Sequence, residues 1–309
     1  MTEGSRRAIL AAFLANLGIA GSKLAAFFVT GAASMLAEAV HSFADTGNQA
    51  LLLLGSARGR RAASEEHPFG YGRERYFWAF VVALVLFALG ALFAIAEGIE
   101  KLREPHDLTR AGWAIGVLVV AIVLESFSLR TAVREANVVR GSEDWWSFVR
   151  HSKSPELPVV LLEDVGALVG LAFALAGVGL AIATGEPRFD ALGSIAIGVL
   201  LGGIAVVLAK EMKSLLIGES AAPGVTATIR AALESAPQVR RLIHLRTLHL
   251  GPEELLVAAK IELDASLRFA DVARAIDAAE ARVREQVPSA RMIFLEPDVM
   301  RPPQGPDRS

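Results

Sequence analysis

The chain has 309 residues, 53% of them hydrophobic, and its mean hydropathy is +0.45. An ordinary soluble domain is about 45–50% apolar, so this composition favours a membrane protein. The net charge is −2 and no stretch concentrates Lys or Arg, which excludes nucleic acid as a partner. There is no Cys, so disulfides and thiolate ligands are excluded, and a transition metal would need His, Asp, Glu or Asn as ligands.

Six apolar stretches of about twenty residues recur along the first two thirds of the chain, and each can cross a hydrocarbon layer of about 30 Å. The first is too long for the core of a cleavable signal peptide, and more spans follow it. We therefore predict an all-α domain of six membrane spans, at about 8–29, 34–55, 76–98, 111–129, 158–184 and 190–209.

The positive charges predict which way the spans run. Six crossings place both termini on one side, and most Lys and Arg lie at the termini and in the loops on that side. The loops on the opposite side hold only Lys101, Arg103, Arg110 and Arg188. Because positive residues are retained in the cytoplasm, we expect both termini there. High Ala and Arg usage is typical of a GC-rich bacterium, so the expected location is the inner (plasma) membrane.

The character of the sequence changes after Lys213, where charges become more frequent and Ala222-Pro223-Gly224 has the composition of a linker. The pattern predicts a helix at 226–234, strands at 242–250 and 255–263, a helix at 268–287 and a strand at 291–295. We predict domains at 1–213 (six spans) and 214–300 (a soluble α+β domain that dimerises), with a disordered tail at 301–309.

The second span carries polar residues inside apolar sequence. His41 and Asp45 are four residues apart, so they lie on one helical face. A carboxylate within a membrane span is costly unless it faces a cavity or a partner. We predict that both bind a metal ion, since imidazole and carboxylate suit zinc. The alternative is a buried His–Asp hydrogen bond that joins helices.

The fifth span adds the adjacent acids Glu163 and Asp164, whose side chains point about 100° apart on a helix, so at most one faces His41 and Asp45 squarely. We predict Asp164 as a ligand. Glu163 is a fourth ligand, a proton acceptor or a group that contacts a neighbouring helix. Asn16 and Asn48 line the same cavity or proton path, or else join helices by hydrogen bonds.

Two further segments carry residues of interest. The loop that contains His67 could touch metal on the cytoplasmic side, although we expect it to tie the second and third spans together. The stretch 142–151 mixes Trp with charged residues, which is typical of an amphipathic linker at the membrane surface.

With these residues in place, the chain resembles the cation diffusion facilitator family over nearly its whole length. The resemblance rests on His41-x-x-x-Asp45, on the run His-Pro-Phe-Gly-Tyr-Gly at 67–72, on Phe-Asp-Ala-Leu-Gly-Ser at 189–194, and on Leu-Leu-Ile-Gly-Glu at 215–219. It implies a homodimer, a ferredoxin-like and metallochaperone-like cytoplasmic domain, and metal/proton exchange by alternating access. The Leu-Leu-Glu-Asp run is most similar to the branch that contains the mitochondrial zinc exporter.

The sequence departs from the family pattern in two places. Better-known zinc exporters have His or Asp where this chain has Val160, so Glu163 or water would complete the site, and the oxygen-rich set could also admit manganese, iron or cobalt. In the tail, positions that bind regulatory zinc in relatives correspond to Ile243, Lys260 and Phe294. The remaining candidates His244, His249 and Glu296 can lie on solvated faces of the strands.

The expected function is therefore export of Zn²⁺, or of Mn²⁺, Fe²⁺ or Co²⁺, in exchange for protons, with lipid as surroundings and no resident cofactor. One alternative is a regulatory, metal-binding membrane subunit that does not transport. A membrane metalloenzyme is a second rival, since His and two carboxylates can activate water. The sequence lacks His-Glu-x-x-His, so we expect no enzyme.

Overall fold

The computed structural model describes residues 3–105 and 111–299, without the side chains of 3–16, 33, 41, 45, 85–87 and 111. The chain divides into two compact units, which are described separately. One comprises Met1–Ala57 and Arg75–Lys213, and the other comprises Arg58–Glu74 and Ser214–Ser309. The predicted domain boundaries stay predictions, and the predicted disordered tail lies outside the described residues.

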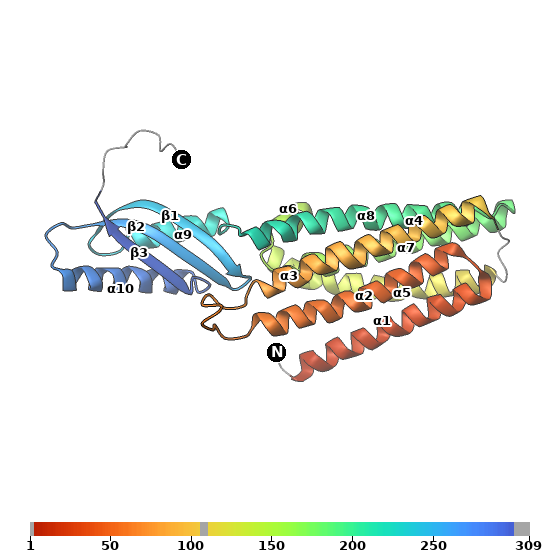
Figure 1. Ribbon diagram of the computed structural model, residues 1–309, viewed down its shortest axis with the longest axis horizontal. Helices are drawn as coiled ribbons and strands as arrows, with labels where there is room; N and C mark the ends of the chain where they lie inside the picture. The colour runs from red at the N-terminus through yellow and green to blue at the C-terminus, as the bar shows by residue number, and fades with distance from the viewer. Residues whose placement is uncertain (1–2, 106–110, 300–309) are drawn as a thin grey trace, which may run out of the picture. The chain divides into compact units, whose positions relative to one another are not determined.

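The first unit is built from long helices that run alongside one another (Figure 1). Its elements are α1 (Glu3–Thr30), α2 (Ala33–Gly59), α3 (Glu74–Val81), η1 (Val82–Phe87), α4 (Ala88–Arg103), α5 (Ala111–Arg140), α6 (Trp145–His151), α7 (Glu156–Thr184) and α8 (Arg188–Ile217). The segments α3, η1 and α4 form one helix that is interrupted by a π-helical turn. The predicted linker at 142–151 contains the short helix α6, which the Asp144 side chain caps by accepting from the Ser147 N–H.

Four helices in the described part of the chain are long and apolar enough to cross a membrane. They are Glu74–Arg103, Gly112–Arg140, Glu156–Thr184 and Arg188–Ile217. In α1 the apolar segment with described side chains is the shorter stretch Leu17–Thr30, and α2 carries several polar residues along its length. The chain is therefore a multi-pass membrane protein, while the count of six crossings stays a prediction.

The turn between α1 and α2 is held by side chains from two other helices. Gly31 ends α1 with a φ of +67°, a conformation that suits glycine, and its carbonyl oxygen accepts from the Lys101 Nζ of α4 at 2.5 Å. The buried Asp190 of α8 accepts from the backbone N–H and the hydroxyl of Ser34, in the first turn of α2. The ends of α1 and α4 and the starts of α2 and α8 thus meet at one end of the bundle, here called the α1–α2 end.

The second unit contains α9 (Pro223–Glu234), β1 (Val239–Gly251), β2 (Glu254–Leu263), α10 (Phe269–Gln286) and β3 (Met292–Asp298). The described sheet has the order β1-β2-β3, with β1 antiparallel and β3 parallel to β2. Alternate residues of β2 are buried and form one core with both helices. The predicted order of helices and strands is therefore found, whereas the finer ferredoxin-like assignment stays a prediction for these three strands.

The loop between α2 and α3 packs within this second unit. A Cβ atom on Gly72 would lie 2.7 Å from the carbonyl oxygen of Leu250, so the loop approaches the β1–β2 turn as closely as glycine allows. The rings of His67 and Tyr71 lie 4.5 Å apart, centroid to centroid. The loop connects α2 to α3, and it also packs on the sheet.

The remaining polar candidates of the tail lie in different surroundings. His244 and Glu296 are exposed as expected, and the Glu296 carboxylate forms an ion pair with Lys260 at 2.8 Å. His249 is buried, which corrects the expectation of a solvated face. It lies where β1 meets its turn, and its Nδ1 is 3.4 Å from the carbonyl oxygen of Gly251. No metal ligand set follows from this arrangement.

Candidate metal-binding site in the helix bundle

The predicted ligands come from α2 and α7, and the structure describes those on α7. Glu163 and Asp164 are both buried, with 3% and 7% of their surface exposed. The side chains of His41, Asp45 and Asn16 lie outside the described part of the structure, so their predicted roles stay predictions. The backbone places both His41 and Asp45 within the continuous helix α2.

Asp164 is held by a hydroxyl group from a neighbouring helix. The Ser128 Oγ of α5 lies 3.2 Å and 3.1 Å from the two carboxylate oxygens of Asp164, and the hydroxyl donates to them. The helices α5 and α7 pack closely along their length. A carboxylate in such a position is oriented before any ligand arrives, because its hydrogen bond fixes the side chain.

Glu163 is buried on the adjacent face of α7, so both acids of the pair point into protein. Because adjacent residues of a helix point about 100° apart, at most one of the two acids is expected to face the α2 ligands squarely. Asn48 of α2 is also buried, and neither its amide oxygen nor its nitrogen has a hydrogen-bond partner among the described residues. Since Asn48 is three residues after Asp45, it lies on the same helical face. Its amide is therefore available to a ligand in the bundle.

An ion pair that the sequence analysis missed lies in the interior of the same bundle. The Lys23 Nζ of α1 binds Glu38 Oε2 of α2 at 3.1 Å, and it donates to the Ser42 Oγ at 2.7 Å. Neither Lys23 nor Glu38 has exposed surface. The second carboxylate oxygen of Glu38, Oε1, has no hydrogen-bond partner among the described residues.

Glu125 of α5 connects this ion pair electrostatically to the predicted site. It is 9% exposed and lies in the field of Lys23, while its own charge acts on Asp164. Because Glu125 and Ser128 are three residues apart, they share one face of α5. The buried polar groups of α1, α2, α5 and α7 therefore form one electrostatic neighbourhood.

A signal for these residues was present in the sequence. Lys23 and Glu125 are ionisable residues within apolar spans, which is the same criterion that selected Asp45 and Asp164. Glu38 precedes His41 by three residues and shares its helical face. Applied to every span, the rule would have found all three residues, although it could not have shown which of them pair.

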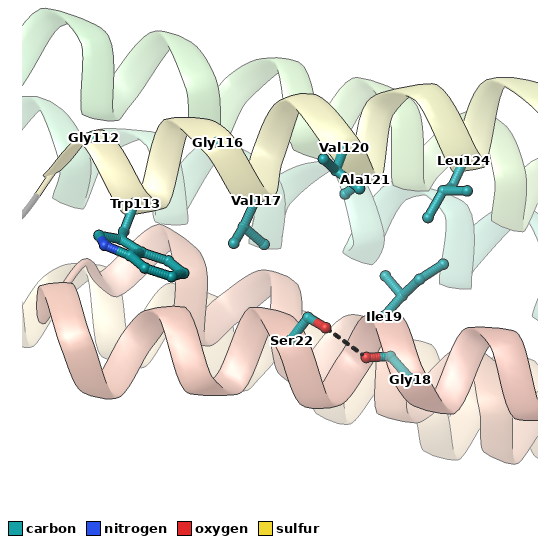
Figure 2. A pocket seen from close by; sticks show the side chains of 10 residues that line it. All are labelled: Gly18, Ile19, Ser22, Gly112, Trp113, Gly116, Val117, Val120, Ala121 and Leu124. Carbon is teal, nitrogen blue, oxygen red and sulfur yellow. Dashed lines mark hydrogen bonds between the residues drawn. The ribbon is translucent and has the colours of Figure 1, made fainter.

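A groove on the surface of the first unit does not contribute to the site. It has a volume of about 860 Å³ and lies between α1 and α5. Figure 2 shows that Gly18, Ile19 and Ser22 line it from α1, while Trp113, Val120 and their neighbours line it from α5. The Ser22 hydroxyl donates to the carbonyl oxygen of Gly18 at 2.9 Å. With no carboxylate or imidazole in its lining, this groove offers a metal ion no suitable ligand.

The interior of the bundle is rich in buried ionisable groups. The described part of the first unit contains five buried carboxylates and one buried ammonium group. Asp190 caps α2 at the α1–α2 end, and the remaining groups are Glu38, Glu125, Glu163, Asp164 and Lys23. The described side chains, which do not include those of His41 and Asp45, form no cluster of three or more potential metal ligands. A complete ligand set at this place would therefore require α2 to contribute, as predicted.

Comparison with known proteins identifies the relatives of both units. Residues 9–217 match the description "Cation efflux transmembrane domain", and residues 223–298 match "Cation efflux protein, cytoplasmic domain". The chain is 34% identical over 244 residues to the proton-coupled zinc antiporter SLC30A9, mitochondrial, of Xenopus laevis; the match covers 78% of this chain and 44% of the relative. The human protein of the same name is 32% identical, with 78% and 43% covered.

More distant relatives come from plants and magnetic bacteria. Metal tolerance protein C4 of Arabidopsis thaliana is 29% identical over 86% of this chain and 58% of its own length. Magnetosome protein MamB of Paramagnetospirillum magneticum is 25% identical over 92% of this chain and 90% of its own length. The chain thus spans less than half the length of the SLC30A9 relatives it matches. Because the two family domains together cover most of its residues, the chain belongs to the cation efflux, or cation diffusion facilitator, family.

Proposed function

We propose that this chain moves divalent transition-metal ions, zinc foremost, across a membrane in exchange for protons. The buried Asp164, oriented by Ser128 in the bundle interior, is the observation that carries the proposal. His41 and Asp45 of α2 supply the other ligands, and Glu163 or water completes the set. Asn48 lines the cavity beside them. Members of the family are transporters, which agrees with the expectation that the chain is not an enzyme.

Zinc is the first candidate because two of the similar proteins carry the name proton-coupled zinc antiporter. Carboxylate and imidazole ligands also suit manganese, iron and cobalt, and Val160 adds no ligand that would favour zinc. Metal ions bind the deprotonated forms of His and Asp, so binding releases protons. If the two sides of the membrane gain access to the site in turn, metal and protons move in opposite directions.

The setting of this activity is proposed as well. Six crossings with both termini in the cytoplasm follow from the Lys and Arg distribution, and the inner membrane of a bacterium is the proposed location. The cytoplasmic domain joins two copies of the chain into a homodimer, a role supported by its match to the cytoplasmic domain of cation efflux proteins.

The test is transport by the purified full chain in proteoliposomes, with metal uptake and internal pH followed together. Wild-type protein should take up zinc with matching proton movement, and a comparison with manganese, iron and cobalt gives the selectivity. Asp45→Asn and Asp164→Asn should each abolish both signals. Asp277→Asn is the matched control, because it makes the same chemical change on the exposed surface of α10.

The outcomes separate the candidate functions. Wild-type rates in Asp45→Asn or Asp164→Asn would refute the proposed ligand set. Zinc uptake without proton movement would leave a metal transporter but remove the exchange. Movement of no metal by folded wild-type protein would favour the regulatory, metal-binding subunit instead.

A further inference from the structure

The buried ion pair of Lys23 and Glu38 lies to one side of the predicted metal site. Glu38 is three residues before His41, so it lies about 4.5 Å nearer the start of α2. Glu125 is likewise three residues before Ser128 on α5. The helix α2 begins at the α1–α2 end, and α5, which follows α4 in the chain, begins there too (Figure 1). Both acids therefore lie between the metal site and that end of the bundle.

The contact of Glu38 with α7 gives the same position. Glu38 and Glu125, together with Lys23 and Ser42, are called the Glu38 layer below. A Cβ atom added to Gly170 would lie 2.6 Å from Glu38 Oε1, so Glu38 sits against the backbone of α7 at this residue. Gly170 follows Asp164 by six residues, or about 9 Å along the helix. Since α7 runs toward the α1–α2 end, the Glu38 layer is again displaced from the metal site in that direction.

The Glu38 layer contains acidic side chains that could bind a cation, and its cation in this structure is the ammonium group of Lys23. The ammonium group of Lys23 lies between the carboxylate of Glu38 and the hydroxyl of Ser42, in the field of Glu125. One positive charge thus lies in the field of two carboxylates, of which Glu38 pairs with it directly. The fully buried Glu38 Oε1 has no hydrogen-bond partner among the described residues, and leaving such an oxygen unsatisfied is unfavourable. The layer therefore has ligand capacity that Lys23 alone does not use.

We propose that Glu38, Ser42 and Glu125 form a second cation site, which Lys23 occupies at rest and through which the metal leaves the first site toward the α1–α2 end. Carboxylate and hydroxyl oxygens can ligate a divalent metal ion in place of the ammonium group. The Lys23 side chain has a flexible four-carbon stem, so its ammonium group can leave Glu38 when a metal ion arrives. This inference rests on the proposed transport function, because it assigns a step on the same path.

The binding test counts zinc ions on the full chain in detergent, by equilibrium dialysis with inductively coupled plasma measurement. Lys23→Met removes the resident cation, so this variant should bind one more zinc ion per chain than wild type. Lys23→Arg keeps a cation at the same place and should bind as many as wild type. In the double variant Lys23→Met with Glu38→Gln, the additional zinc ion should be lost.

A second variant keeps the proposal testable if Lys23→Met does not fold. Glu38→Gln preserves the shape of the side chain and an oxygen that can accept from Lys23, but it weakens the second site as a metal ligand. Its zinc count should equal that of wild type, while zinc transport should fall at least about tenfold. Transport by Glu38→Gln at the wild-type rate would overturn the proposal.

The remaining outcomes distinguish this inference from the transport function. A folded Lys23→Met variant that binds no additional zinc would overturn the second site, whatever the wild type transports. If wild type transports no metal but Lys23→Met still gains one zinc ion that Glu38→Gln removes, the site stands and its place on a transport path is refuted.

Discussion

The crossing of α4 and α8 allows a direct test of the fold, because on each helix a glycine packs against an isoleucine of the other helix. A Cβ atom on Gly98 would lie 2.6 Å from the Ile195 side chain and 3.0 Å from its backbone nitrogen. A Cβ atom on Gly198 would lie 2.5 Å from the Ile95 side chain and 2.9 Å from its backbone nitrogen. Close approach of this kind is how small residues join helices in membranes.

We expect Gly98→Ala and Gly198→Ala to destabilise the bundle. An isoleucine side chain can rotate, but a backbone nitrogen cannot move unless the helices separate. Overpacking costs about 1–3 kcal/mol, whereas Ala in place of Gly within a helix gains about 1 kcal/mol. The net loss of unfolding free energy is therefore about 0–2 kcal/mol for each variant. The double variant should lose less than the sum, because helices already separated by one methyl group accept the second more easily.

The assay is equilibrium unfolding of the full chain in detergent, followed by circular dichroism. Gly203→Ala on α8 is the matched control, since a Cβ atom there meets nothing within 4 Å. That variant should be more stable than wild type by up to about 1 kcal/mol. If Gly98→Ala were as stable as Gly203→Ala, the close crossing of α4 and α8 would be wrong.

Three further predictions address the site, a helix cap and the tail. Ser128→Ala removes the hydroxyl that orients Asp164, so zinc affinity measured by titration should fall about tenfold or more, and unchanged affinity would exclude this role. Asp190→Ala removes the cap of α2 and should lower the unfolding free energy by about 0.5–2 kcal/mol, measured by chemical denaturation in detergent. The N–H and hydroxyl of Ser266 lower the pKa of Asp264 to about 2, so the stability that this carboxylate contributes is present above about pH 4 and is lost toward pH 2. The melting temperatures of wild type and Asp264→Asn should therefore differ at neutral pH and converge near pH 2; a constant difference would contradict the assignment.

Much of the fold follows from periodicity. Alternation along 255–263 predicted β2, and burial of every second residue there shows why the pattern was informative. The apolar stretches located the long helices but underestimated α5, which continues to Arg140 instead of ending near 129. Its last turns contain charged residues that hydropathy alone assigned to a loop. A helix can continue beyond the hydrocarbon layer. Hydropathy therefore predicts the segment that crosses the membrane but not the residue at which the helix ends.

The buried acids of the bundle were predictable in part, for a physical reason. An ionisable residue in an apolar span is costly, and that cost selected Asp164, which is buried as expected. The partner of a buried charge is harder to predict, because Lys23 and Glu38 meet across two helices and only packing brings them together. The close fit of Gly170 against Glu38 Oε1 was equally hidden, since a glycine in a span has no polar signal.

The balance of buried charge indicates what the bundle interior is for. Inserting a charged residue at the centre of a membrane helix costs about 2.5–3.5 kcal/mol, and an apolar replacement of a buried ion pair is often neutral or stabilising. Packing alone would therefore require none of Glu38, Glu125, Glu163 and Asp164, and Lys23 offsets only one of their charges. A further positive charge that enters the bundle would offset part of this excess. A divalent metal ion or protons would supply that charge, which is why we place both exchange partners in this part of the molecule.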